Sequence, residues 1–214
     1  MKKFSEYLKE EQEYQDGGLT IFDIDDTLFH TTAQIGVIKN GKKVKSLSNQ
    51  EFNTYKLGAG ESFDYDEFAD AAKFNAESKP IGKMLDKAKI ILKNSEKNPN
   101  SRVIIVTARN DFDNKEIFLN TFRKHGFDID KVRVERAGKI SDVSDVAFKK
   151  VIIIRNYINT KRFKRVRLFD DSMANLKAFL KLKTEFPMVK FEAFFANHDG
   201  SVRTVKWKHL MNSL

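Results

Sequence analysis

Residues able to carry out phosphoryl transfer occur in four separate segments of this 214-residue chain. The segments are Asp23-Ile24-Asp25-Asp26-Thr27, Thr107-Ala108-Arg109, Asp145 with Lys149-Lys150, and Asp170-Asp171 with Asn175. Acidic side chains gathered in one place repel each other unless a cation offsets them, and oxygen ligands favour a hard ion such as Mg²⁺. Because aspartate is a competent nucleophile toward phosphorus, the residue types together indicate phosphoryl-transfer chemistry.

The chemical segments follow apolar runs of the kind that form buried strands. The runs include LTIFDI at 19–24, RVIIVT at 102–107, KVRVER at 131–136 and RVRLFDD at 165–171. Helical patterns between or beside them cover 64–76, 81–94, 113–125, 144–159 and 172–183. Strands that alternate with helices predict a parallel sheet covered on both faces, with ligands bound beyond the carboxyl ends of the strands.

The chain divides into a core and an insertion in this interpretation. A helix is predicted over 1–18, a core domain over 19–32 and 96–214, and a small cap over 33–95. The cap should begin with a hairpin, because Asn40-Gly41 is suited to a type I′ turn. A second hairpin is expected around Asp199-Gly200 near the end of the chain. The predicted fold is α/β, three-layered and Rossmann-like, with a mainly parallel five-stranded sheet and the cap after strand one.

The ordered motifs resemble those of the haloacid dehalogenase (HAD) superfamily. The resemblance covers about residues 19–175: an apolar strand with Asp-x-Asp-x-Thr, a Thr after strand two, a Lys before strand four and an acidic pair after it. It implies a phosphatase with Asp23 as nucleophile, Asp25 as general acid and later base, and Thr107 as a ligand of a phosphate oxygen. It also implies an Mg²⁺ site formed by Asp23, Asp170, Asp171 and the backbone carbonyl of Asp25.

The lysine and the substrate-binding residues are less tightly specified. Lys149 and Lys150 lie about 100° apart on a helix, so only one can face the site, and Lys149 is favoured. An Asp four residues before the lysine, here Asp145, is similar to the 3′-phosphatase domain of polynucleotide kinases, as is Arg109. Arg109 is expected to grip phosphate bidentately. The other expected substrate-binding residues are Asp26, Thr27, Ala108 and Lys150. The chain departs from polynucleotide kinases because it has no P-loop kinase half and a longer insertion.

Charge suggests the class of substrate. The net charge is +9, with an acidic stretch at 61–70 and a basic one at 149–167, which favours a nucleotide or a nucleic-acid 3′-phosphate as substrate and nucleic acid as partner. One alternative is a protein phosphatase of the same superfamily. Another is a non-catalytic nucleic-acid-binding or virion protein with the same fold. The oligomeric state stays open.

Composition indicates where the protein works. The chain has no cysteine and no apolar run long enough to cross a membrane, so a cytoplasmic location without membrane partners is expected. The first residues resemble head-targeting leaders of some tailed-phage proteins, with a Leu-x-Glu pattern at Leu8-Lys9-Glu10. On that alternative the location would be a virion. A plain amphipathic helix that packs on the sheet is favoured over a leader.

Overall fold

The computed structural model describes residues 14–52, 54–141 and 145–206. A six-stranded sheet forms its centre, in the order β11-β10-β9-β1-β7-β8. The pairs β10–β9, β9–β1, β1–β7 and β7–β8 are parallel, and β11 is antiparallel to β10. The strands are β1 (Gly17–Phe22), β7 (Arg102–Thr107), β8 (Arg133–Arg136), β9 (Phe163–Asp170), β10 (Lys190–Ala196) and β11 (Val202–Val205).

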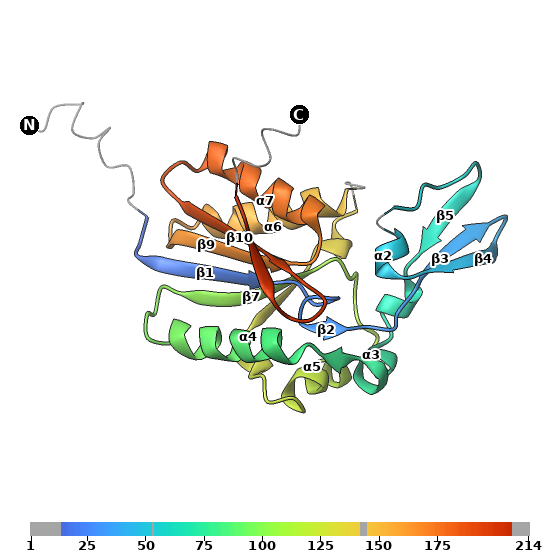
Figure 1. Cartoon of the computed structure of the whole chain (residues 1–214), viewed down its shortest axis with the longest axis horizontal. Coiled ribbons are helices and arrows are strands. Elements are labelled where there is room, and N and C mark those ends of the chain that lie inside the picture. Colours follow the sequence, from blue (N-terminus) through green and yellow to red (C-terminus); the bar gives the residue numbers. More distant parts are fainter. Residues whose placement is uncertain (1–13, 53, 142–144, 207–214) are drawn as a thin grey trace, which may run out of the picture.

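Helices cover both faces of this sheet, which makes the fold three-layered, α/β and Rossmann-like as predicted (Figure 1). One face packs against α4 (Gly82–Ser95) and α5 (Lys115–Arg123), and the other against α6 (Val146–Ile158) and α7 (Met173–Glu185). The five parallel strands match the predicted number. The sixth strand arises because the Asp199-Gly200 turn, with Gly200 at a φ of 78°, folds β11 back along β10.

A smaller unit is inserted between β1 and α4 and projects from the core (Figure 1). It contains an antiparallel sheet in the order β4-β3-β5, and the predicted turn joins β3 to β4 with Asn40 and Gly41 at φ values of 51° and 73°. We call residues 35–68 the insertion. Its elements are β3 (Ile35–Lys39), β4 (Lys42–Leu47), α2 (Asn49–Phe52), β5 (Glu61–Asp64) and the short helical turn η1 (Asp66–Phe68).

The insertion is shorter than the predicted cap of 33–95. Met84, Leu85 and Ala88 of α4 pack into the main core beside Phe22, and so does Phe74 of α3 (Ala71–Glu77). The apolar faces of α3 and α4 are therefore buried against the central sheet instead of within a cap. The short pair β2 (Phe29–His30) and β6 (Lys79–Pro80) closes the base of the insertion.

Two further element predictions differ from the structure. The predicted helix over 1–18 lies mostly outside the described residues, and within them β1 already begins at Gly17. The predicted helix over 64–76 begins only at Ala71, because the Asp70 side chain accepts a hydrogen bond from the Lys73 amide and caps α3 there. Short turns η2 (Ile129–Lys131) and η3 (Ala137–Lys139) flank β8.

Candidate active site

The first acidic segment lies at the centre of the carboxyl edge of the sheet. Asp23 follows β1 directly, and its amide donates to the Phe169 carbonyl of β9 at 3.0 Å. The chain then turns back, because the Phe29 amide donates to the Ile24 carbonyl at 3.0 Å and Asp26 adopts a left-handed φ of 54°. This compact loop holds the acidic residues of the segment close to the end of the sheet.

Lys150 bridges the first and last acidic segments. Its ammonium nitrogen lies 2.7 Å from Asp23 Oδ1 and 2.9 Å from Asp170 Oδ2, and the residue is only 2% exposed. Burial alone would lower the pKa of Lys150, but the adjacent charges of Asp170 and Asp23 outweigh it and raise that pKa. Lys150 is therefore a permanent positive charge between two buried carboxylates.

Asp170 is held rigidly at the end of β9. The Ser172 amide donates to its Oδ1 at 2.9 Å, and Asn175 Nδ2 donates to the same oxygen at 2.8 Å. Ser172 also caps α7, since its side chain accepts from the Asn175 amide. The carboxylate therefore has a fixed orientation before any ligand arrives.

Three acidic side chains of the site fit a hard cation. Oxygens of Asp23, Asp170 and Asp171 lie within 4.8 Å of one another, the one such cluster among the described residues. Burial raises the pKa of Asp23 to about 7, with Lys150 opposing this and Asp170 adding to it. Burial, then the charges of Asp170 and Asp23, raises the pKa of Asp171 to about 9. Crowded all-oxygen donors that resist ionisation together are suited to Mg²⁺.

The choice of Lys149 over Lys150 is corrected by this geometry. Lys149 is partly exposed, whereas Lys150 reaches Asp23. Asp145 caps α6, accepting from the Ala147 amide at 2.8 Å, and so fixes where the helix begins. A sequence signal for Lys150 existed: it lies on the stripe of buried α6 residues, which are Ala147, Lys150, Val151, Ile154 and Ile158.

Arg109 does not have the phosphate-gripping arrangement expected for it. Its Nε and Nη2 donate to the two carboxylate oxygens of Asp25 at 3.0 and 2.7 Å, and its Nη1 donates to the Phe68 carbonyl at 2.9 Å. The guanidinium also lies over the rings of Phe68 and Phe74. Arg109 is 2% exposed, so its guanidinium is enclosed within the protein.

The hydroxyl of Thr107 is buried at the end of β7. It accepts a hydrogen bond from the Arg109 amide at 3.2 Å, which leaves its own hydrogen free to donate. Ala108 is exposed beside it. The Thr27 hydroxyl is also buried and has no hydrogen-bond partner among the residues that the structure describes. Thr107 thus keeps a hydroxyl donor at the carboxyl end of β7, the strand that pairs with β1.

The Asp26 carboxylate contacts the insertion, and its charge also acts on Asp171 of the acidic cluster. Asn49 Nδ2 at the start of α2 donates to its Oδ2 at 3.0 Å, and His30 Nδ1 lies 3.3 Å from its Oδ1. The His30 ring stacks on His198, with centroids 3.9 Å apart. Sequence reasoning missed Asn49, because no local pattern links a residue of the insertion to the acidic loop.

Comparisons with known proteins give no match by sequence and a distant similarity in structure. No known family model and no curated protein sequence matches it. Among solved structures it is similar to the HAD domain of effector protein Lem4 from Legionella pneumophila, with 12% identity and a TM-score of 0.46 over 94% of this chain and 95% of that one. A likeness this distant transfers no residue roles. The fold and site themselves define an α/β protein of Rossmann-like type with an acidic cluster at the carboxyl edge of its sheet.

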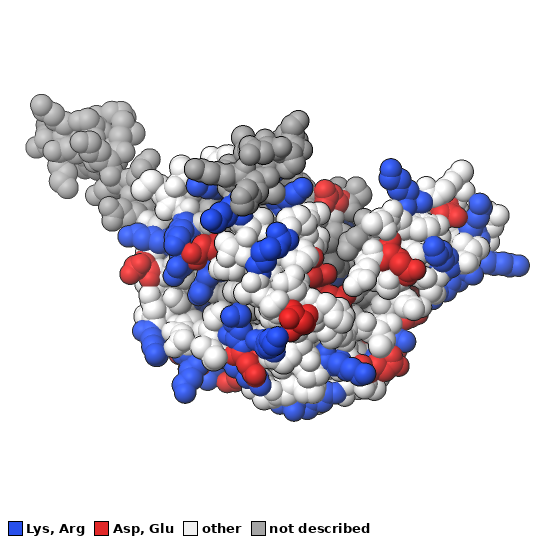
Figure 2. Space-filling model, viewed as in Figure 1, with Lys and Arg blue, Asp and Glu red and all other residues white. Residues whose placement is uncertain are grey.

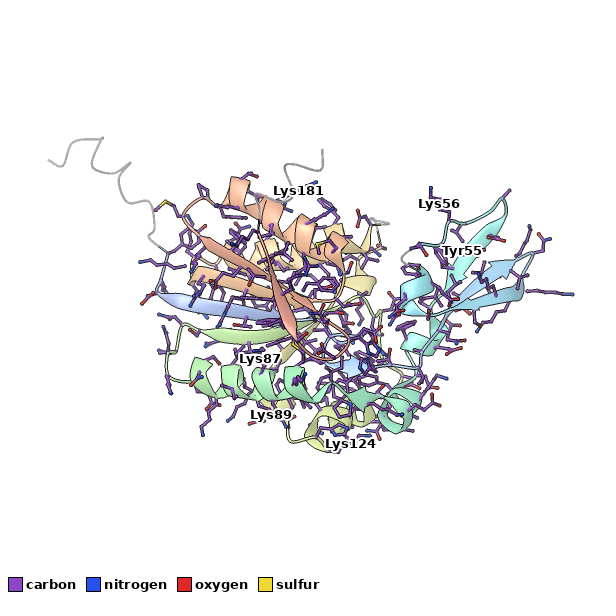
Figure 3. The ribbon with its side chains drawn as sticks, in the orientation of Figure 1. Tyr55, Lys56, Lys87, Lys89, Lys124 and Lys181 are labelled. Atoms are coloured by element: carbon purple, nitrogen blue, oxygen red, sulfur yellow. The ribbon has the colours of Figure 1, made fainter. Side chains whose placement is uncertain are left out.

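Basic side chains are scattered over the face of the molecule seen in Figure 2. Figure 2 shows Lys and Arg over the visible face of the core and on the insertion, interspersed with acidic residues. Lys56 lies on the insertion, Lys87 and Lys89 on α4, and Lys181 on α7, so these lysines belong to separate parts of the molecule (Figure 3). No helix in the described part of the chain has the length and hydropathy needed to span a membrane.

Proposed function

We propose that this chain is a Mg²⁺-dependent phosphomonoester hydrolase of the HAD type that acts through an aspartyl-phosphate on Asp23. The observation that carries the proposal is the position of Asp23, directly after the central strand and paired with Lys150 at 2.7 Å. Asp25 stands two residues further along the same loop. A nucleophile, a second carboxyl group and a fixed cation are what phosphoryl transfer requires.

Each side chain has a definite task in this reaction. The Asp23 carboxylate attacks phosphorus in line as the bond to the leaving oxygen breaks, and Asp25 gives that oxygen a proton. Asp25 then takes a proton from the water that hydrolyses phospho-Asp23. The Thr107 hydroxyl donates to a phosphate oxygen, and Lys150 offsets the charge on Asp23.

Asp23, Asp170 and Asp171 would hold the magnesium ion. When bound, the ion supplies positive charge to the phosphoryl oxygens. The favoured substrate is a nucleotide or a nucleic-acid 3′-phosphate, on the basis of the net charge of +9. The scattered lysines give this preference for a polyanion less support than a continuous basic track would.

The test is phosphate release by the wild type and by Asp23→Asn, with and without magnesium. An aryl phosphate, nucleoside monophosphates, a phosphopeptide and a 3′-phosphorylated oligonucleotide form the panel. Release should require magnesium and fall by more than about 10³-fold in Asp23→Asn, because a neutral amide of the same shape is a poor nucleophile. Asp86→Asn is a matched control, since its exposed carboxylate pairs with Lys89 on the surface. Turnover by Asp23→Asn near the wild-type rate would reject the proposal.

A further inference from the structure

The contacts of Arg109 connect the second acid of the loop to the base of the insertion. The guanidinium donates to both oxygens of Asp25 and also to the carbonyl of Phe68, the last residue of η1. It is packed between the rings of Phe68 and Phe74, with its central carbon 5.1 and 4.5 Å from the ring centroids. One buried side chain therefore spans the core and the insertion.

This arrangement fixes the plane of the Asp25 carboxyl group. A guanidinium fork bonds a carboxylate through two parallel N–H···O contacts and so sets its rotation as well as its position. Each carboxylate oxygen has a second lone-pair direction, and the fork uses only one on each. The remaining lone pair on each Asp25 oxygen is left free to take part in proton transfer. A single ammonium group could not impose the same orientation, because it is a point charge on a flexible chain.

Resting on the proposed function, we infer that Arg109 is a positioning residue that orients the Asp25 carboxyl group toward the leaving oxygen. The contact of the insertion with the core, made through Phe68, determines this orientation. In the first step the P–O bond to the leaving group breaks as the bond from phosphorus to Asp23 forms, and the Asp25 proton passes to the leaving oxygen. Arg109 does not touch the phosphate. Its loss should therefore impair proton transfer and leave phosphate binding largely intact.

The dependence of the rate on the leaving group distinguishes a residue that positions the general acid from one that binds the phosphate. An aryl phosphate with an acidic phenol, such as p-nitrophenyl phosphate, leaves without needing a proton, whereas a simple alkyl phosphate needs one. A well-placed general acid contributes about 10²–10⁴-fold, so Arg109→Lys should lower kcat/KM for the alkyl ester at least about 10-fold more than for the aryl ester. A lost phosphate ligand would lower both by the same factor.

The ratio of the alkyl-ester rate to the aryl-ester rate is also unaffected by partial misfolding. Arg109→Lys and Arg109→Ala both disturb a buried ion pair, but the alkyl-to-aryl ratio within one preparation does not depend on the fraction that is folded. Arg123→Lys is the matched control, because Arg123 makes the same fork to Asp130 on the surface, with its Nε 2.9 Å from Asp130 Oδ2. It should leave the ratio unchanged.

The link through the insertion is tested with a variant in which a short Gly/Ser linker replaces residues 35–68. Its alkyl-to-aryl ratio should fall in the same direction as that of Arg109→Lys, since Arg109 loses the Phe68 carbonyl and ring. An unchanged ratio in Arg109→Lys would overturn the positioning role, and an unchanged ratio in the linker variant would overturn the link. If the wild type released phosphate from neither ester in an Asp23-dependent manner, the proposed function itself would fail and this inference with it.

Discussion

Two buried carboxylates share one ammonium group in the candidate site, and this arrangement governs both its stability and its chemistry. Lys150 contacts Asp23 and Asp170, while Asp171 stands beside them without such a partner among the described residues. Burying a charge is costly unless it is paired, so the pairings decide which of these acids is ionised without metal.

Lys150→Ala tests the assignment of the lysine. The substitution leaves Asp23 and Asp170 without their counter-charge, which should destabilise the fold by about 3–5 kcal/mol and abolish most of the turnover. Lys149→Ala, at the partly exposed neighbouring position, should change stability by less than about 0.5 kcal/mol. Denaturant unfolding and phosphate release per folded molecule would measure both effects. A larger loss of turnover in Lys149→Ala would return the catalytic role to that residue.

The raised acid pKa values predict an unusual pH dependence for the metal-free protein. The pKa is about 7 for Asp23 and about 9 for Asp171 in the folded chain, against about 4 in an unfolded one. Between about pH 4 and pH 9 the folded state thus binds more protons, so the free energy of unfolding should fall as pH rises. Unfolding midpoints measured in a chelator across this range would show the slope.

Asp171→Asn should make the free energy of unfolding depend less steeply on pH. It should also stabilise the metal-free protein near pH 8 by on the order of 1–3 kcal/mol. Added magnesium should stabilise the wild type and have a smaller effect on this variant, because binding to the folded state alone raises stability. If magnesium stabilised both proteins equally, Asp171 would not be a ligand.

At the scale of elements, the loop after β7 depends on close contact with η3. A Cβ added at Gly138 would lie 2.4 Å from Asn110 Oδ1 and 2.5 Å from the Ala108 carbonyl oxygen. The second of these is backbone, which cannot rotate away. Glycine at 138 thus allows η3 to support the loop that begins at Thr107 and carries Arg109.

Gly138→Ala should therefore displace this loop, destabilise the protein by about 1–3 kcal/mol and lower turnover. Gly82→Ala is the control, because a Cβ at this position in α4 meets nothing within 4 Å. Alanine there should leave stability unchanged or raise it by up to about 1 kcal/mol. Thermal unfolding and phosphate release would test the pair; equal effects at the two sites would contradict the close-contact explanation.

At the scale of the whole molecule, the insertion is packed separately from the core. Ile35, Val37, Leu47 and Phe68 form their own apolar cluster with Ala33, whereas the two clusters on the sheet faces draw on none of the described residues of 35–68. The ends of the insertion are close together, since the Gln34 amide donates to Glu67 at 3.1 Å. Removal of the insertion should therefore leave both sheet-face clusters complete.

The linker variant without residues 35–68 should still unfold in one cooperative transition. Its midpoint should fall by roughly 5–10 °C, because the contacts of Phe68 with Arg109 and of Asn49 with Asp26 are lost. Circular dichroism during heating would measure this. A variant with no cooperative transition would show that the insertion is part of the folding unit.

Much of the fold followed from local patterns. Apolar runs predicted the parallel strands, and Asn40-Gly41 and Asp199-Gly200 predicted both hairpins, because strand burial and turn conformation depend on neighbouring residues. The sequence also predicted that the acidic segments would follow the strands, since parallel strands end at one edge. The structure brings Asp23, Asp170 and Asp171 together there.

Other features depended on packing between distant segments. Whether Lys149 or Lys150 faces Asp23 depends on the rotation of α6 against the sheet, which the packing of its buried stripe fixes. The fork from Arg109 to Asp25 joins residues 84 positions apart. The extent of the insertion depended on which core buries α3 and α4. Motifs specify which groups are available, but only tertiary packing decides which group fills each buried position, because burial and pairing energies are properties of the assembled neighbours.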